Sequence, residues 1–296
     1  MTMPAANPAT TAVLLLAHGS PDSVEQVPEF LLRVTGGHPL PVQVIQEVQR
    51  RYGLIGRSPL TQLTLKQADL LASKLGLRVY VGMRNWKPFI ADAVRDMVSD
   101  GVRRAVVICL APHNSRTSVG LYRSALAAEN PPFTVKFVDS WHDHPMLIRA
   151  FAEKLCAGRQ PGIPIIFTAH SVPQRTVTEG DPYERQAKET AALVAREAAL
   201  APEDWSFAFQ SQGMSGGAWL GPTVEDTILS LREKGHRTVF IQPIGFLCDH
   251  VEVLYDVDIG FKQFAEQQGM HLTRAASLND SPLLTAALAD LVGMAR

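Results

Sequence analysis

A histidine stands directly after a predicted buried strand in the segment Thr-Ala-His-Ser-Val-Pro at 168–173. The apolar run at 163–167 predicts that strand, and the proline-closed polar turn ends it at the carboxyl edge of its sheet. In open α/β sheets, ligands bind at this edge. The imidazole of His170 can accept a proton near neutral pH and ligate a metal ion. A lone histidine at a strand end is more often a hydrogen-bonded structural residue. This segment alone therefore does not show whether His170 has a functional role.

The same pattern occurs near the start of the chain. Residues 13–21 read Val-Leu-Leu-Leu-Ala-His-Gly-Ser-Pro, an apolar strand followed by Ala-His, small residues and proline. The two copies lie about half a chain apart, which indicates two similar α/β halves. We therefore expect His18 and His170 at equivalent strand ends.

A third segment adds carboxylates at another strand end. The apolar run at 238–241 leads into Pro-Ile-Gly-Phe-Leu-Cys-Asp-His-Val-Glu-Val-Leu-Tyr-Asp at 243–256. Glu252 and Asp256 are spaced i, i+4, so they share one face of the helix that opens there. Glu252 suits metal capture and proton removal. Asp256 is read equally well as a solvated helix residue or a member of a surface ion pair.

The elements that carry these residues alternate between strand and helix patterns. Apolar runs predict further strands at 77–82, 105–110, 133–139 and 207–210, with amphipathic helices between them. This alternation is typical of parallel sheets with right-handed crossovers. We expect two similar Rossmann-like α/β domains, 12–143 and 144–296, each with a parallel sheet of about four strands flanked by helices. A disordered tail is expected at 1–11, and the closing helix at 282–294 is a candidate to pack back on the first domain.

Composition excludes several classes of protein. The 296 residues carry a formal net charge of −1, which does not favour a nucleic-acid partner. The three cysteines lack C-x-x-C spacing, which argues against a disulfide framework, a zinc knuckle or an iron–sulfur cluster. No signal peptide or apolar stretch of membrane-spanning length is found. We expect a cytoplasmic monomer.

The chain resembles the ferrochelatases, enzymes that insert ferrous iron into a porphyrin. The resemblance rests on the segment around His170, on Gln-Ser-Gln and Trp-Leu-Gly-Pro between 210 and 222, and on the segment 245–256. It runs from about Val13 to the last helix. It implies a chelatase-like fold, porphyrin and Fe(II) as substrates, and no tightly bound cofactor.

The resemblance also implies roles for individual residues. His170 and Glu252 match the catalytic and metal-binding pair, and Asp256, one turn on, would extend an outer metal path toward solvent. A third acidic position on that helix face is Gly260 here. Residues that match porphyrin contacts are His18, Arg51, Tyr52, Ser58 and Tyr122. Two positions depart from the pattern of the soluble coproporphyrin enzymes: His18 replaces a tyrosine, and an arginine near 35–37 is missing.

Two alternatives remain open at the level of sequence. Ala-His-Gly-Ser at 17–20 also resembles the chelatases that insert cobalt into sirohydrochlorin. A two-domain binding protein that carries a metal or tetrapyrrole without turnover would use the same histidines and carboxylates. Between the porphyrins, the absence of a membrane segment and the match at Arg51, Tyr52, Ser58 and Tyr122 favour coproporphyrin III over protoporphyrin IX.

Overall fold

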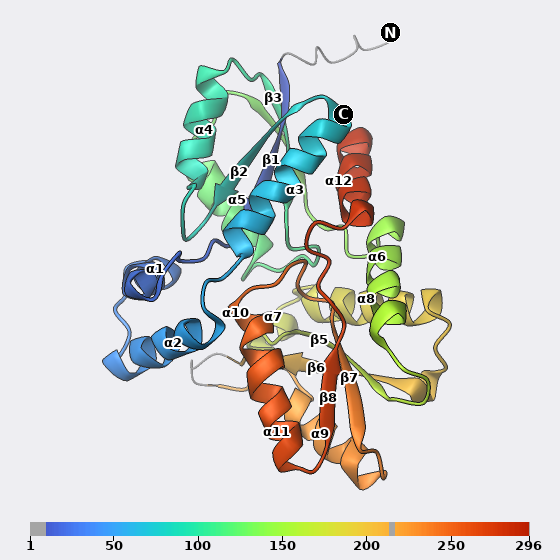
Figure 1. Cartoon of the computed structure of the whole chain (residues 1–296). Coiled ribbons are helices and arrows are strands. Elements are labelled where there is room, and N and C mark those ends of the chain that lie inside the picture. The colour runs from blue at the N-terminus through green and yellow to red at the C-terminus, as the bar shows by residue number, and fades with distance from the viewer. Residues whose placement is uncertain (1–9, 213–216, 296) are drawn as a thin grey trace.

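The computed structural model describes residues 10–212 and 217–295. The tail expected at 1–11 falls largely outside the described residues, and Thr11 already belongs to the first strand, β1 (Thr11–Ala17). Two parallel four-stranded sheets form the framework (Figure 1). This confirms the expectation of two similar α/β units.

The first sheet has the strand order β2-β1-β3-β4. Its other strands are β2 (Arg78–Met83), β3 (Arg104–Cys109) and β4 (Thr134–Val138). Every residue of β1 is buried, because this strand has paired neighbours and helices on both faces. Helices α4 (Ile90–Ser99) and α5 (Val119–Ala128) cover one face, and α3 (Leu60–Leu75) covers the other. Helices α1 (Val27–Val34) and α2 (Val42–Ile55) extend to the side (Figure 1).

The second sheet repeats this plan with the order β6-β5-β7-β8. Its strands are β5 (Ile165–His170), β6 (Trp205–Gln210), β7 (Thr238–Pro243) and β8 (His271–Arg274). Helices α6 (Pro145–Gly158) and α8 (Tyr183–Glu197) cover one face. Helices α9 (Val224–Glu233) and α11 (Lys262–Gln267) cover the other. Sequence patterns did not predict β8, because this edge strand alternates between exposed and buried residues without an apolar run.

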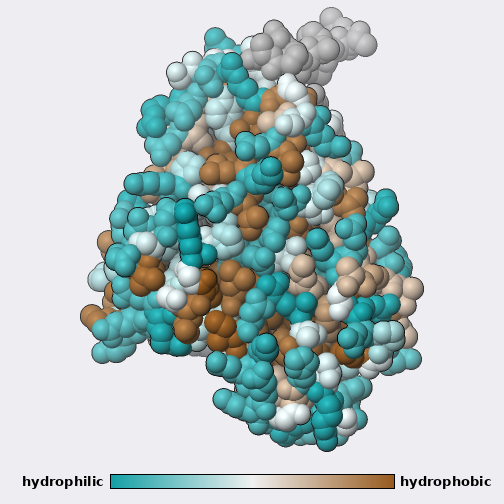
Figure 2. Space-filling view, viewed as in Figure 1, coloured by the Kyte–Doolittle hydropathy of each residue, from teal (hydrophilic) through white to brown (hydrophobic). Residues whose placement is uncertain are grey.

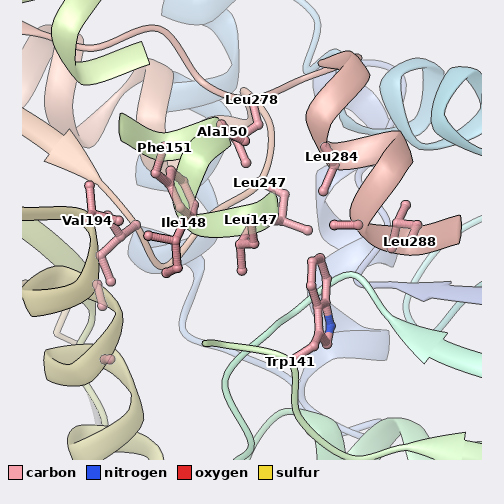
Figure 3. Packing of buried hydrophobic residues seen from close by; sticks show 14 of the residues in the cluster. Trp141, Leu147, Ile148, Ala150, Phe151, Val194, Leu247, Leu278, Leu284 and Leu288 are labelled. Atoms are coloured by element: carbon pink, nitrogen blue, oxygen red, sulfur yellow. The ribbon is translucent and has the colours of Figure 1, made fainter. Parts of the chain in front are cut away.

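One hydrophobic core joins the two halves. The last helix, α12 (Pro282–Ala295), contacts both α6 and α3, so the end of the chain packs against the first half. Trp141 belongs to this core, and Figure 3 shows it near Leu284 and Leu288 of α12. Its indole Nε1–H donates to the carbonyl of Cys109 at 3.0 Å. Packing of this kind fixes how the strand ends of the two sheets face each other.

Short elements follow the strand ends and carry the candidate site residues. They are α7 (Gln174–Thr178) after β5, and α10 (Val251–Leu254) followed by a π-helix (Asp256–Phe261) after β7. At the end of β1 the turn requires glycine: Gly19 has φ +85°, and a Cβ there would lie 2.8 Å from the backbone nitrogen of Trp86. The tight turn holds His18 at the sheet edge.

Candidate active site

A cavity of about 540 Å³ lies between the two halves, lined mainly by apolar side chains. This size suits a small organic ligand. Loops at the carboxyl ends of both sheets line it, together with parts of α1, α2, α5 and α10. On the face seen in Figure 2, hydrophobic surface gathers in the region between α2 and α10. Five of the predicted residues line the cavity: His18, Tyr52, Tyr122, His170 and Glu252.

His170 and Glu252 form a pair inside this cavity. The Nε2 atom of His170 lies 3.6 Å from Oε2 of Glu252, and the side chains are 36% and 33% exposed. The other ring nitrogen, Nδ1, contacts the carbonyl oxygen of Ser171 at hydrogen-bond distance. A proton on Nδ1 leaves Nε2 as an acceptor. Oε2 of Glu252 is buried and has no hydrogen-bond partner among the described residues. In the tautomer with its proton on Nδ1, His170 therefore presents a nitrogen lone pair toward Oε2 of Glu252.

Gln210 ties together the two elements that carry this pair. Its side-chain oxygen accepts from Thr168 Oγ1 at 2.7 Å, on the strand that ends at His170. Its side-chain nitrogen donates to the backbone carbonyl of Glu252 at 3.0 Å. The Tyr183 hydroxyl donates to the carbonyl of His170 at 2.8 Å. These bonds hold the backbone at His170 and at Glu252 in fixed positions relative to each other.

Close backbone approach fixes the loop before α10. A Cβ on Gly245 would lie 2.9 Å from the Cα of Ala169, so only glycine fits between the loop and β5. Further along, Asp249 accepts hydrogen bonds from Ser277 at 2.7 Å and from the Asn279 side chain at 2.9 Å. Arg274 adds an ion pair to Asp249 at 3.2 Å. The loop that leads to Glu252 is therefore held by β5 at Gly245 and by the segment 274–279 at Asp249.

The two carboxyl groups of this helix differ in their electrostatics. Burial tends to raise the pKa of Glu252, but attraction to the protonated form of His170, and to a smaller extent to His250, His18 and Arg51, outweighs burial and lowers the pKa below its ordinary value. Burial raises the pKa of Asp256, opposed by the hydrogen bond from Ser211. Glu252 is thus held as the carboxylate, while Asp256 takes up a proton more readily than an ordinary aspartate.

His18 has both ring nitrogens engaged. Nδ1 lies 3.0 Å from the carbonyl oxygen of Gly19, and Nε2 lies 2.9 Å from the side-chain nitrogen of the buried Asn85. Phe30 packs edge-on against the ring at 5.7 Å between centroids. Burial is the main reason that the pKa of His18 is lowered. The ring is neutral in this arrangement, and it can turn a nitrogen toward a ligand only by giving up a hydrogen bond.

The remaining predicted residues divide between the cavity and its surroundings. Tyr52 and Tyr122 line the cavity, and the Tyr52 hydroxyl lies 3.0 Å from Ser20 Oγ. Arg51, Ser58 and Asp256 lie outside the lining. Arg51 pairs with Glu47 at 2.9 Å and with Asp256 at 3.3 Å, which connects α2 to the π-helix of the other half. Buried Ser58 lies 3.5 Å from the backbone nitrogen of Leu60, at the start of α3.

Several residues of the site carried no role in the sequence analysis. Gln210 lies within a motif that was recognised, yet only the structure gives it a function in positioning. Tyr183, Arg84 and His113 also line the cavity. Tyr183 lies on a helix, and its hydroxyl contacts a backbone carbonyl, so no local pattern predicts that contact. Among the described residues, no group of three or more His, Cys, Asp or Glu side chains is arranged to hold a metal ion.

Comparison with known proteins identifies the family. The ferrochelatase family model matches residues 10–295. The chain belongs to the ferrochelatase family. It is 55% identical to a ferrochelatase of Acidobacterium capsulatum over 95% of this chain and 93% of that protein. It is 37% identical to a ferrochelatase of Deinococcus radiodurans, over 95% of this chain and 94% of that protein. It is 34% identical to a coproporphyrin III ferrochelatase of Geobacillus sp. (strain WCH70), over 95% and 96%.

Solved structures support the fold of this ferrochelatase-family chain. SirB from Bacillus subtilis with Fe3+ superposes with a TM-score of 0.62 at 11% identity, over 97% of this chain and 95% of that one. CbiX, described as the terminal enzyme of sirohaem synthesis in denitrifying bacteria, superposes with a TM-score of 0.54 at 17% identity, over 96% of this chain and 99% of that one. These likenesses confirm a chelatase-like fold. None of the helices in the described residues has the length and apolar character needed to cross a bilayer.

Proposed function

We propose that this protein inserts Fe(II) into a porphyrin, with His170 and Glu252 as the reacting pair and coproporphyrin III as the preferred substrate. The observation that supports the pair most directly is the buried, unpartnered Oε2 of Glu252, 3.6 Å from His170 Nε2 in the cavity. A buried carboxylate oxygen without a partner is costly. Such a group is expected where a metal ion or a transferred proton supplies the missing partner.

The reaction requires two proton transfers and one metal transfer. Two pyrrole N–H bonds break, two protons leave, and iron enters with its oxidation state unchanged. With a proton on Nδ1, His170 offers Nε2 as the acceptor for the two protons in turn, and each leaves toward solvent by way of Asp256 before the next is accepted. The lowered pKa of Glu252 keeps it ionised, so its carboxylate can ligate the incoming Fe(II) and replace water in its coordination shell.

Two protein ligands suit an ion that passes through the site. Resident metals are commonly held by three or four protein ligands, and no such group was found among the described side chains. A site with His170 and Glu252 alone would leave coordination positions of the iron open to the porphyrin nitrogens. Asp256 lies outside the cavity lining and has a raised pKa, which suits a group that accepts a proton on its way from the cavity to solvent.

The rest of the cavity suits a flat apolar ring. Its lining is mostly apolar, and Phe30, Leu31 and Val34 of α1 contribute to it. Burying the macrocycle supplies binding energy from which a distortion of the ring can be drawn. The ring distortion is needed because pyrrole lone pairs must tilt toward an ion arriving from one face.

Turnover tests this proposal. Anaerobic mixing of porphyrin, Fe(II) and catalytic amounts of protein should give many equivalents of metalloporphyrin, followed by absorbance. His170→Ala and Glu252→Gln should each lower kcat by about 10²-fold or more, the usual contribution of a positioned acid or base. Glu233→Gln, at an exposed position of α9, and His38→Ala, in an exposed loop, are matched controls that should retain activity.

Two results would refute the assignment. A stoichiometric absorbance change without turnover would indicate a carrier, and near-normal kcat in either variant would remove that residue from the reaction. Thermal unfolding of each variant separates loss of chemistry from loss of fold. The substrate preference is tested by kcat/KM for coproporphyrin III and protoporphyrin IX in one detergent-containing buffer. A higher value for protoporphyrin IX overturns the preference and leaves the iron chemistry intact.

A further inference from the structure

The element that carries Glu252 is held at both of its ends by the end of β8 and the loop after it. Before Glu252, the carboxylate of Asp249 accepts hydrogen bonds from Asn279 at 2.9 Å and from Arg274 at 3.2 Å. After it, Asp258 of the π-helix accepts two hydrogen bonds from the same guanidinium, at 2.6 and 2.8 Å. A helix of four residues such as α10 has little stability of its own. The position of Glu252 therefore depends on these contacts.

Asn279 contributes to them with both its side chain and its backbone. Its side-chain oxygen accepts from the backbone N–H of Asp249 and its side-chain nitrogen donates to the Asp249 carboxylate, both at 2.9 Å. Its own N–H donates to the carbonyl of Leu247 at 2.9 Å. The backbone of Asn279 has φ +48°, a left-handed conformation that asparagine adopts more readily than most residues. An amide side chain supplies the adjacent donor and acceptor that the two bonds to Asp249 require.

The first half of the molecule also holds Asn279. Gln67 of α3 is 1% exposed, and its side-chain nitrogen donates to the carbonyl of Asn279 at 2.6 Å. The side-chain oxygen of Gln67 is buried without a hydrogen-bond partner among the described residues, which costs stability. Thr64, one turn earlier on α3, lines the cavity. The bond from Gln67 thus joins a helix of the cavity wall to the segment that holds Glu252.

We infer that Asn279 is a positioning residue for the proposed metal insertion: it sets where the Glu252 carboxylate lies relative to His170, and Gln67 fixes that position against the first half. This inference rests on the proposed function. Asn279 lies outside the cavity lining, so it acts through Glu252 and not on a substrate. Its loss should therefore slow metal insertion and leave porphyrin binding unchanged.

Asn279→Gly tests this role with little strain, because glycine keeps the left-handed backbone and only the two side-chain bonds to Asp249 are lost. The kcat for iron insertion should fall by about tenfold or more, since a displacement of about 1 Å in a reacting group can cost 10²-fold. The affinity for metal-free coproporphyrin III, measured by fluorescence without iron, should stay unchanged. Gln67→Met, which removes the bond from the first half, should lower kcat by a smaller factor with the same unchanged affinity.

Asn130→Gly is the matched control. Asn130 also has a left-handed backbone, with φ +45°, at an exposed position just after α5, so this variant should retain kcat. Ser277→Ala is a milder second variant, which removes only the 2.7 Å hydrogen bond to Asp249. It should give a smaller fall in kcat with unchanged porphyrin affinity, and it keeps the test decisive if thermal unfolding shows that Asn279→Gly does not fold.

A double-mutant cycle distinguishes positioning from general support of the fold. In the Glu252→Gln background, whose remaining turnover is followed at higher protein concentration, Asn279→Gly should lower kcat by a much smaller factor than in the wild type. The reason is that the carboxylate that Asn279 positions is already gone. A residue that only stabilises the fold would lower kcat by the same factor in both backgrounds.

The outcomes are distinguishable. Equal factors in the two backgrounds, an unchanged kcat in Asn279→Gly, or a fall in porphyrin affinity as large as the fall in kcat would each overturn the inference while the wild type still inserts iron. An unchanged kcat in Gln67→Met would overturn the part assigned to the first half. Near-normal turnover of Glu252→Gln, or a wild type without turnover, would instead refute the proposed function and the inference with it.

Discussion

His113 gives a prediction whose size can be worked from its surroundings. It is 2% exposed, lines the cavity, and has Nε2 2.9 Å from Thr190 Oγ1. Burial, with a smaller contribution from His142, lowers its pKa from 6.5 to about 3. The unfolded chain therefore binds a proton near pH 6.5 that the folded protein does not take up until about pH 3. Stability contributed by neutral His113 is present above pH 6.5 and is lost as pH falls through that window.

A pH of 5 lies about 1.5 units below the pKa of the histidine in the unfolded chain. At 1.36 kcal/mol per unit, this lowers the free energy of unfolding by about 2 kcal/mol. The contribution near pH 7 is close to zero. Folded His113 is neutral at pH 5, because its pKa is about 3. His113→Gln keeps a side-chain N–H for Thr190 and removes the titration.

The assay is urea unfolding followed by circular dichroism at pH 7, 6 and 5. Between pH 7 and 5 the wild type should lose about 2 kcal/mol more stability than His113→Gln. His38→Gln, which removes an exposed histidine, is the control and should follow the wild type. Parallel pH curves for wild type and His113→Gln would refute the argument that His113 is buried in the neutral form.

Two further substitutions test the geometry of the site. Gly245→Ala should destabilise the protein by about 1–3 kcal/mol, because the added Cβ would lie 2.9 Å from the backbone of Ala169. The control is Gly53→Ala on α2, where the added Cβ has no atom within 4 Å and should stabilise the protein by up to about 1 kcal/mol. Equal thermal shifts for the two variants would contradict the contact argument. Asp256→Asn should lower kcat less than Glu252→Gln, because Asp256 lies outside the cavity lining; an equal or larger loss, measured in the same turnover assay, would place Asp256 in the reaction itself.

Local patterns were sufficient for most of the framework. The buried runs of β1, β3 and β5 are continuous apolar segments, and Gly76 ends α3 with φ +64° as its position after the last periodic residue indicates. The edge strand β8 was missed because a half-exposed segment of four residues lacks such a signal. Helical spacing placed Glu252 and Asp256 on one face, but the π-helix that begins at Asp256 follows from no local pattern.

Contacts between distant residues could not be predicted in this way. The sequence analysis assigned Arg51 to the porphyrin by resemblance; in the structure its side chain pairs with Asp256, which lies 205 positions later. Likewise, Asn85 was not expected beside His18, and this hydrogen bond changes what a histidine can do at that position. Both contacts depend on how the strand ends of the sheets face one another, which is set by the core around Trp141 and α12.

The distribution of charge across the cavity follows from this arrangement. Burial keeps His18 and His113 neutral, so they add no positive charge to the walls. The second half contributes Glu252, which is held as an anion 3.6 Å from His170 Nε2, and the first half contributes Arg84, whose Nε has no hydrogen-bond partner among the described residues. In the proposed function, an incoming Fe(II) ion is therefore attracted to the side of Glu252. A ring held between the two halves would meet the metal on the face where its protons can be accepted.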